Sequence, residues 1–477
     1  MAADAAETHP RTATGLKTAV VVIHGIGNQS PMATLRDFVD AVWTTDSGLV
    51  GRGPPRVWLK RDLVSNNHDL QRITTSRDKS GRRTDFFEFY WAHMLEDTRF
   101  SSVALWLGRV FRRSPRRVPP EVWAPWVAGI AVMVAFAALL ISGVAALLVF
   151  PVRTFPAALA LVAILSLAAW GIAFLRRRLL VEVVGDAARY LTADPQNIDA
   201  RARIRSAGLA LLKQLNDSED YDRVILACHS LGTVIGFDLI NFYWGDVCET
   251  IKYPIQGTSP LTRVENAARS LVAADDPSRP QRLEEFRLEQ RRFASHLCNA
   301  PSAKWKITDF VTIGSPLAHS HFLIVNDLEL PKRRPGDEQG ESWLADWHKR
   351  LDPKTRRVAR AFLSRLAERS AAATPPLAEG SGRISYPRSD EIHCSPHHGA
   401  VFAAVRWTNI YAPRRNVLWG DMIGGPVAPL FGPGVEDIAL DGAVARSIGA
   451  HTKYWVENRD TTHLEALREA INLRDLP

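Results

Sequence analysis

Ser230 stands in a local sequence that can make a nucleophile. Residues 224–227 (Val-Ile-Leu-Ala) form an apolar run typical of a buried strand, and residues 228–232 (Cys-His-Ser-Leu-Gly) precede a second apolar run compatible with a helix. A sharp strand-to-helix turn exposes a serine hydroxyl and aims the next amide at a reacting carbonyl. Gly232 supplies the small residue that such a turn requires, whereas Cys228 replaces the usual first glycine. We predict Ser230 as the nucleophile and the Leu231 amide as one oxyanion donor.

A second oxyanion donor must come from a loop that follows a neighbouring strand. Residues 18–23 are a continuous run rich in β-branched side chains, as expected of a buried parallel strand. The loop after it reads His24-Gly25-Ile26-Gly27-Asn28-Gln29. Glycines let the backbone approach a reacting centre, so we prefer the Ile26 amide as donor and assign His24, Gly25 and Gly27 to the loop framework. Alone, this segment would indicate only an ordinary glycine-rich turn.

A base and an acid lie near the C-terminus. Residues 405–411 look like a strand, a loop carrying Asp421 follows, and His451 comes further on. His451 would take the Ser230 proton and return it to the leaving group, while Asp421 would hold the imidazole tautomer. The sequence leaves alternatives: Asp437 and Asp441 for the acid, both nearer His451 in sequence, and His463 for the base.

These segments together resemble the serine hydrolases of the α/β-hydrolase superfamily, and more closely the lipase-like proteins related to GPI-inositol deacylases and bacterial membrane-associated hydrolases. The resemblance covers residues 17–95 and 180–475, and is carried by residues 24–29, 228–232, 312–317, 421–425 and 451–455. It implies a mostly parallel sheet flanked by helices, places the Gly-Ser-Pro segment with Ser315 near the active site, and implies ester or thioester hydrolysis. The order serine, acid, histidine is also that of the superfamily.

The middle of the chain is apolar enough to enter a membrane. Residues 124–150 carry Ser142 as their only polar side chain, and residues 155–175 form a second apolar run after a short connection at 151–154. A helix needs ~20 apolar residues to span a hydrocarbon core. We therefore expect a two-helix transmembrane hairpin at residues 123–175, rather than a pair of buried core helices.

Arginines on both sides of this segment indicate its orientation. They lie at positions 109, 112, 113, 116 and 117 before the first span, and at 176, 177 and 178 after the second, whereas the connection holds only Arg153. The positive-inside rule then puts both ends, and the hydrolase domain, in the cytoplasm. The net charge of +8 is thereby accounted for largely by headgroup contacts. No finger spacing or basic aromatic face indicates nucleic-acid binding.

The organisation of the remaining chain follows from these assignments. Of the 477 residues, we expect 1–16 to be a disordered N-terminus without a signal peptide, 17–122 and 176–477 to form the two parts of the hydrolase domain, and 246–305 to be a helical insertion able to cap the site. Helices are predicted at 32–44 and 181–215, and further strands at 56–63, 85–91 and 307–313. The chain before residue 18 is too short for two further strands, so we expect the sheet to be trimmed at the edge where such strands would lie. Four unpaired cysteines favour a reducing compartment.

Other chemistries are less well supported. His393, Cys394, His397 and His398 could suggest a metal site, but Pro396 and Gly399 favour a loop. Serine-hydrolase chemistry needs neither metal nor cofactor. The expected function is therefore cleavage of a carboxylic ester of a lipid or other acyl substrate at the bilayer. The alternatives are a thioesterase or peptidase with the same three residues, or a catalytically silent membrane scaffold.

Overall fold

The computed structural model describes most of the two segments that flank the predicted hairpin. It covers residues 17–26, 31–50, 56–62, 71–95, 195–272, 277–300, 303–320, 384–390, 392–414, 419–447, 449–456 and 460–474, together with isolated positions between 108 and 190.

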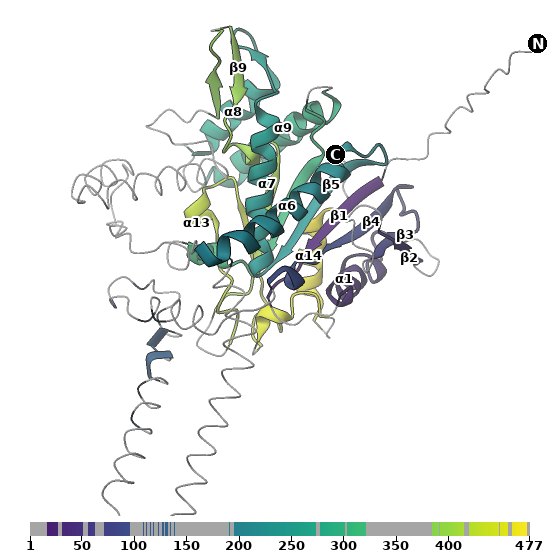
Figure 1. Ribbon diagram of the computed structural model, residues 1–477, viewed down its shortest axis with the longest axis vertical. Coiled ribbons are helices and arrows are strands. Elements are labelled where there is room, and N and C mark those ends of the chain that lie inside the picture. The colour runs from purple at the N-terminus through teal and green to yellow at the C-terminus, as the bar shows by residue number, and fades with distance from the viewer. Residues whose placement is uncertain are drawn as a thin grey trace, which may run out of the picture.

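In the described part of the chain, eight strands form one twisted sheet at the centre of the molecule (Figure 1). In spatial order they are β11 (Glu436–Ala439), β10 (Arg406–Tyr411), β7 (Ile307–Ile313), β5 (Tyr221–His229), β1 (Lys17–Ile23), β4 (Arg83–Phe89), β3 (Gln71–Thr75) and β2 (Val57–Arg61). Neighbours from β11 to β4 pair in parallel, whereas β3 is antiparallel to β4 and β2. The predicted mostly parallel sheet is confirmed.

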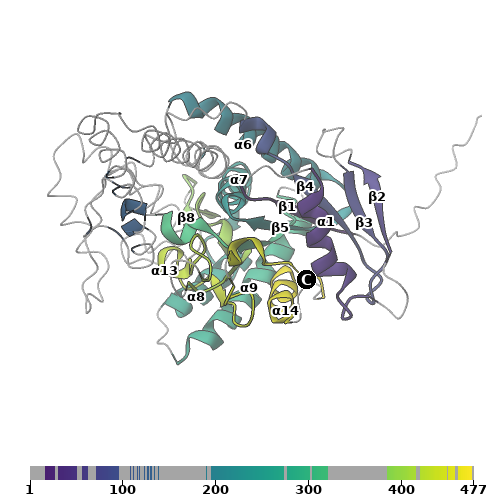
Figure 2. The same cartoon turned by 90° about the horizontal axis from the view of Figure 1, so that it is seen from below.

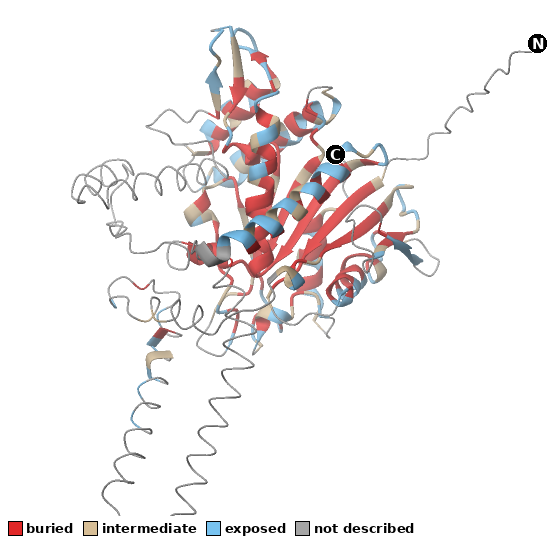
Figure 3. Cartoon of the chain, in the orientation of Figure 1, coloured by how far each residue is buried: buried red, intermediate tan, exposed pale blue. Residues whose placement is uncertain are grey.

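Helices cover both faces of this sheet (Figure 2). The first face carries α6 (Pro195–Asp217) and α7 (Leu231–Cys248), and the second carries α1 (Ala33–Val39), its π-helical extension Asp40–Thr44 and α14 (Thr462–Ile471). Val21 shares a buried cluster with Ile235 of α7, whereas Val20 shares one with Leu35 of α1 and Leu464 of α14. Successive side chains of β1 therefore point to opposite faces, and its apolar run from Ala19 to Ile23 is buried on both (Figure 3).

The edge of the sheet beyond β4 is longer than predicted. We expected a trimmed edge because too little chain precedes β1, and this expectation is wrong. The chain after β1 supplies β2 and β3, and the antiparallel direction of β3 lets it pair with β4 without a crossover helix. β2 is exposed along its whole length, as an edge strand can be (Figure 3).

The insertion at 246–305 lies away from the position of a cap. It contains α8 (Pro260–Val272), α9 (Arg279–Asn299) and β6 (Tyr253–Pro254), which pairs with β9 (His393–Pro396) and through it with β8 (Ser385–Pro387). Gln290 of α9 donates to the carbonyl oxygens of Phe402 and Val405, just before β10 begins. α7 spans about 27 Å from Ser230, so its far end delivers this insertion to the amino ends of the strands. The described helices of the insertion therefore do not cover Ser230.

The remaining described elements are short. They are α13 (Ala428–Phe431) and 3₁₀ turns at Ala92–Leu95, Pro316–His319, Val401–Ala403 and Ala450–Thr452. The predicted hairpin at 123–175 lies almost entirely outside the described residues, and α6 is described only from Pro195. Among the residues that are described, no helix has the length and apolar character needed to cross a membrane.

Candidate active site

A strained turn joins β5 to α7 and carries Ser230. This residue has φ 52° and ψ −127°, a conformation that is strained for any residue with a Cβ atom. The Ser230 amide donates to the carbonyl of Ile313 at 3.0 Å, and α7 begins at the next residue. The neighbouring β7 thus holds the turn in place, and the Leu231 amide lies at the helix N-terminus.

Two glycines of α7 let the turn pack against its surroundings. A Cβ at Gly232 would lie 2.3 Å from the Ile23 carbonyl oxygen of β1, so only glycine fits there. A Cβ at Gly236 would lie 2.5 Å from Cys228 Sγ. The helix thus leaves room for the cysteine that replaces the usual first glycine of the turn.

His451 completes a hydrogen bond with the serine. Its Nε2 lies 2.8 Å from Ser230 Oγ, and its Nδ1 lies 3.0 and 2.9 Å from the two carboxylate oxygens of Asp421. A carboxylate can only accept, so Nδ1 carries the hydrogen and Nε2 is free to accept from the serine hydroxyl. The structure therefore brings together three side chains that lie far apart in the sequence.

Asp421 is the acid that the fold presents to His451. The Tyr454 hydroxyl donates to Asp421 Oδ2 at 2.6 Å and the Ile423 amide to Oδ1 at 2.8 Å. Burial alone would raise the pKa of Asp421, but the charge of His451 and the hydrogen bonds from His451 and Tyr454 outweigh it and hold the pKa well below its usual range. Asp421 therefore remains an anion.

The alternative residues have other partners. Asp437 accepts hydrogen bonds from Asn409 Nδ2 at 2.7 Å and from the amides of Val427 and Ala428. Asp441 lies at the surface, where Arg446 pairs with it at 3.2 Å. His463 is buried in α14 and its Nε2 lies 3.0 Å from the Val456 carbonyl.

The loop after β1 runs against Ser230. A Cβ at Gly25 would lie 2.8 Å from Ser230 Cβ and 3.4 Å from its Oγ, so only a glycine permits this approach. Ile26 follows, partly buried, and Gly27 lies outside the described residues. The His24 ring stacks on Trp91 at 5.2 Å, and Trp91 Nε1 donates to the His24 carbonyl at 3.0 Å. His24 is thus built into the loop framework, and burial lowers its pKa to about 4.

Ser315 supports the Ser230 turn through Thr233. Its Oγ lies 2.7 Å from Thr233 Oγ1, which itself donates to the Ser230 carbonyl at 2.7 Å. Ser315 also accepts from the Leu317 amide and is fully buried. Its position near the site matches what the resemblance implies, and its role is to brace the main chain.

Sequence reasoning assigned no role to three residues that shape the site. Tyr454 binds Asp421, Gly314 lies beneath the Asp421–His451 pair, and His229 contacts the main chain of His451. Tyr454 and Gly314 lie within the segments that carry the resemblance, but their local sequence does not show what they face. Only the tertiary structure brings these contacts into view.

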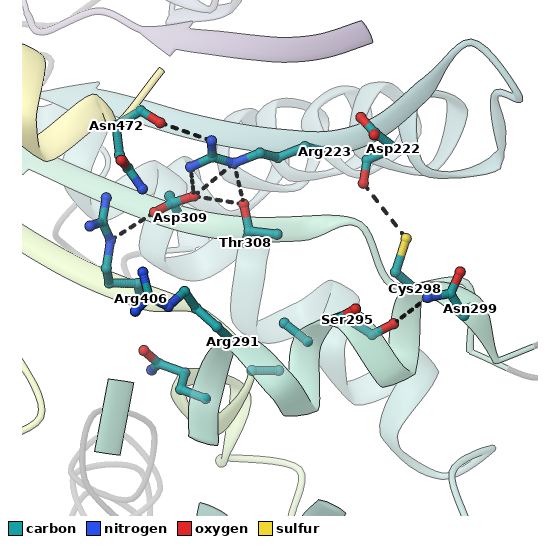
Figure 4. A pocket seen from close by; sticks show the side chains of 13 residues that line it. Asp222, Arg223, Arg291, Ser295, Cys298, Asn299, Thr308, Asp309, Arg406 and Asn472 are labelled. Carbon is teal, nitrogen blue, oxygen red and sulfur yellow. Dashed lines mark hydrogen bonds and ion pairs between the residues drawn. The ribbon is translucent and has the colours of Figure 1, made fainter. Parts of the chain in front are cut away.

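A pocket of about 230 Å³ lies elsewhere, at the amino ends of the central strands (Figure 4). Arg223 of β5 and Arg406 of β10 both pair with Asp309 of β7, at 2.6 and 2.8 Å. Burial would raise the pKa of Asp309, but the two arginines outweigh it and lower the pKa to about 2. These ion pairs join three strands far from Ser230.

The histidines considered for metal binding lie on a strand and a turn. His393 and Cys394 belong to β9, and the His393 ring pairs with Asp390 at 2.9 Å. Within the described part of the chain, no group of three or more histidine, cysteine or acidic side chains is arranged to hold a metal ion.

The fold and the site together define an α/β protein with a mostly parallel sheet and a Ser-His-Asp constellation at the carboxyl ends of its strands. Comparisons with protein-family models, with curated proteins and with solved structures found no match.

Proposed function

We propose that this protein is a serine hydrolase of the α/β-hydrolase fold that cleaves a carboxylic ester. The observation that carries the proposal is the continuous hydrogen-bonded chain from Ser230 Oγ through both nitrogens of His451 to Asp421. An activated serine needs a base within hydrogen-bond reach, and the base needs a third group to orient it. The strained turn beneath Ser230 adds weight, because strain of this kind gathers at functional sites.

In the first half of the reaction, Ser230 attacks the ester carbonyl while His451 accepts the hydroxyl proton at Nε2. Asp421 stabilises the imidazolium that forms. The negative charge on the carbonyl oxygen of the tetrahedral intermediate is met by the amides of Leu231 and Ile26. His451 then gives its proton to the leaving alcohol, and the acyl group stays on Ser230.

In the second half, water attacks the acyl-enzyme. His451 removes a proton from this water, the same two amides hold the second oxyanion, and Ser230 leaves with the proton returned. No metal or cofactor enters either half. A thioester or amide could follow the same course, since the chemistry of acyl transfer does not fix the leaving group.

The proposed substrate class is supported by apolar residues adjacent to the site residues and by the sequence of the middle segment. Met422, next to Asp421, is 45% exposed, and Val456, shortly after His451, is 48% exposed. An exposed apolar patch at the rim of a site favours an apolar ligand, and we propose that these two side chains contribute to one. Residues 123–175 would anchor the chain as a two-span hairpin with the hydrolase domain on the cytoplasmic side. We therefore propose a lipid or another acyl ester presented by the bilayer as substrate.

Replacement of the nucleophile tests this function. Ser230→Ala should lower the turnover of p-nitrophenyl esters by on the order of 10³-fold or more, because removing the nucleophile removes the covalent path. Ser295→Ala, an exposed serine of α9, is the matched control and should leave turnover unchanged. A Ser230→Ala protein with most of its activity intact would refute the proposal. A folded wild-type protein inert toward esters and thioesters would favour the silent scaffold.

A further inference from the structure

His229 lies immediately before the nucleophile and reaches across to the turn that carries the base. His229 is 7% exposed, and its Nε2 lies 2.8 Å from the carbonyl oxygen of His451. The Ser230 hydroxyl, one residue further on, meets the His451 ring at 2.8 Å. His229 thus holds the main chain of His451, and the next residue, Ser230, holds the His451 side chain.

The protonation state of His229 follows from its partner. A carbonyl oxygen can only accept, so His229 Nε2 must carry a hydrogen. Burial, followed by the neighbouring His451, lowers the pKa of His229 to about 3, so the ring stays neutral. Its Nδ1 has no hydrogen-bond partner within the described residues, and a Cβ at Gly25 would lie 3.1 Å from it.

The ring is also held by its packing. The His451 ring lies 4.9 Å from it between centroids, and the Trp455 ring meets it edge-on at 4.8 Å. His229 therefore touches the turn of the nucleophile, the segment of the base and the Gly25 loop. A side chain with three such neighbours has little freedom to leave its position.

His451 needs this support because it lies in a short secondary-structure element. It belongs to a three-residue 3₁₀ turn, Ala450–Thr452, that begins after Gly449 at φ 69°. So short a turn does not fix a side chain by itself. A displacement of about 1 Å in a catalytic group can cost on the order of 10²-fold in rate.

We infer that His229 is a positioning residue that fixes the main chain of His451 relative to the nucleophile. The inference rests on the proposed function and deepens it. His229 touches no reacting atom. Its hydrogen bond holds the base at the distance from which Nε2 can accept the Ser230 proton.

Two replacements of His229 separate the hydrogen bond from the packing. His229→Gln keeps an N–H group at a similar reach, whereas His229→Met fills similar space without a donor. We expect His229→Met to lower kcat for p-nitrophenyl esters by roughly 10- to 100-fold with KM within about twofold, and His229→Gln to restore kcat to within about fivefold of wild type. His463→Met is the matched control, because His463 is also buried and also bonds a carbonyl, that of Val456.

The outcomes are distinct. Equal kcat values for the Met and Gln variants of His229, or an equal kcat loss in His463→Met, would overturn the inference. A folded wild-type protein that does not react with a fluorophosphonate would instead overturn the proposed function.

If His229→Met does not fold, ¹⁵N NMR of histidine in the wild-type protein decides. We expect a neutral Nε2–H tautomer for His229 from pH 5 to 8, and an Nδ1–H tautomer or a titration in that range would refute the inference.

Discussion

The Asp421 carboxylate accepts hydrogen bonds from the Nδ1–H of His451, the hydroxyl of Tyr454 and the amide of Ile423. The Tyr454 hydroxyl in turn accepts from the Ala412 amide at 3.0 Å, just after β10 ends. Burial raises the pKa of Tyr454 well above its usual value, so it keeps its proton and donates. The acid is therefore held in one orientation by its own loop, by a strand end and by the segment of the base.

At this scale we predict that Asp421→Asn lowers kcat for p-nitrophenyl esters by on the order of 10³- to 10⁴-fold. An amide can present its NH₂ to His451 Nδ1, which favours the wrong tautomer of the base. Asp441→Asn is the control, since Asp441 is exposed and pairs with Arg446 at the surface. The kinetics of the two purified variants check this, and a dead Asp441→Asn with an active Asp421→Asn would reverse the assignment.

At the scale of elements, the site forms where β1, β5, β7 and β10 end. The pairing of Ile23 with Cys228 and of His229 with Ile313 puts the Gly25 loop, the Ser230 turn and Gly314 side by side. Gly314 follows β7 at φ 57°, and a Cβ on it would lie 2.9 Å from Asp421 Oδ2 and 3.1 Å from His451 Nδ1. The bare backbone at this strand end leaves the space in which the acid and the base meet.

We predict that Gly314→Ala lowers kcat by about 10²-fold while the protein stays folded, because the new methyl group must displace Asp421 or His451. Gly257→Ala is the matched control. Gly257 also has a positive φ, of 95°, but a Cβ there would meet nothing within 4 Å. Both variants carry backbone strain, so only displacement at the site separates their kcat values. Equal activities of the two variants would contradict this role for Gly314.

Elements with strong local patterns were predictable from the sequence, and contacts that depend on the fold were not. The β-branched run before His24 and the apolar runs on either side of Ser230 indicate β1, β5 and α7 correctly. A strand was predicted at 56–63, where β2 lies, but β3 and the pairing of both strands at the sheet edge were missed, because the pairing of an edge strand is set by its neighbour. The insertion was expected over the site because its sequence does not show that α7 carries it to the opposite end of the sheet.

The candidate site was predictable to the extent that its residues follow strands. Ser230 and Asp421 stand in such places, and the structure brings them together with His451. The part played by His229 could not be read from sequence, because its partner is a main-chain oxygen more than two hundred residues away.

At the scale of the whole molecule, buried titratable groups tie stability to pH in opposite directions. Burial lowers the pKa of His24 to about 4 and of His229 to about 3, so both are neutral in the fold. Their contribution to the free energy of unfolding is fully present above pH 6.5. It is lost as the pH falls, by about 1.4 kcal/mol per pH unit for each histidine. Burial raises the pKa of Glu88 to about 7, so its contribution is present below pH 4.5 and is lost as the pH rises.

We predict that Glu88→Gln makes the free energy of unfolding fall more steeply than in wild type as the pH is lowered from 7 to 5. In wild type, the stabilisation from Glu88 grows as the pH falls and opposes the loss from the histidines. The variant lacks this stabilisation, so the slopes of unfolding free energy against pH should differ between the two proteins by about 1.4 kcal/mol per pH unit. Gln can still accept the hydrogen bond from the Met32 amide that Glu88 accepts at 2.6 Å. Urea unfolding at several pH values measures this, and parallel pH curves for the two proteins would contradict it.

We also predict that removing residues 123–175, with a flexible linker across the cut, frees the domain from membranes. Every proposed catalytic residue lies outside this segment. Hydrolysis of short soluble esters should survive, whereas hydrolysis of bilayer lipids should fall because the local concentration at the surface is lost. Fractionation and assays with both substrates check this. A deletion variant that stays in the alkaline-washed membrane pellet, or a folded one inert to soluble esters, would contradict it.

Covalent labelling of the full-length protein by a fluorophosphonate tests whether Ser230 is an activated nucleophile. Peptide mass spectrometry of the labelled wild-type protein should find the adduct on Ser230, and Ser230→Ala should take up no label. Asp421→Asn should label far more slowly than wild type. A folded wild-type protein that takes up no label, or a label on a different residue, would contradict this role for Ser230.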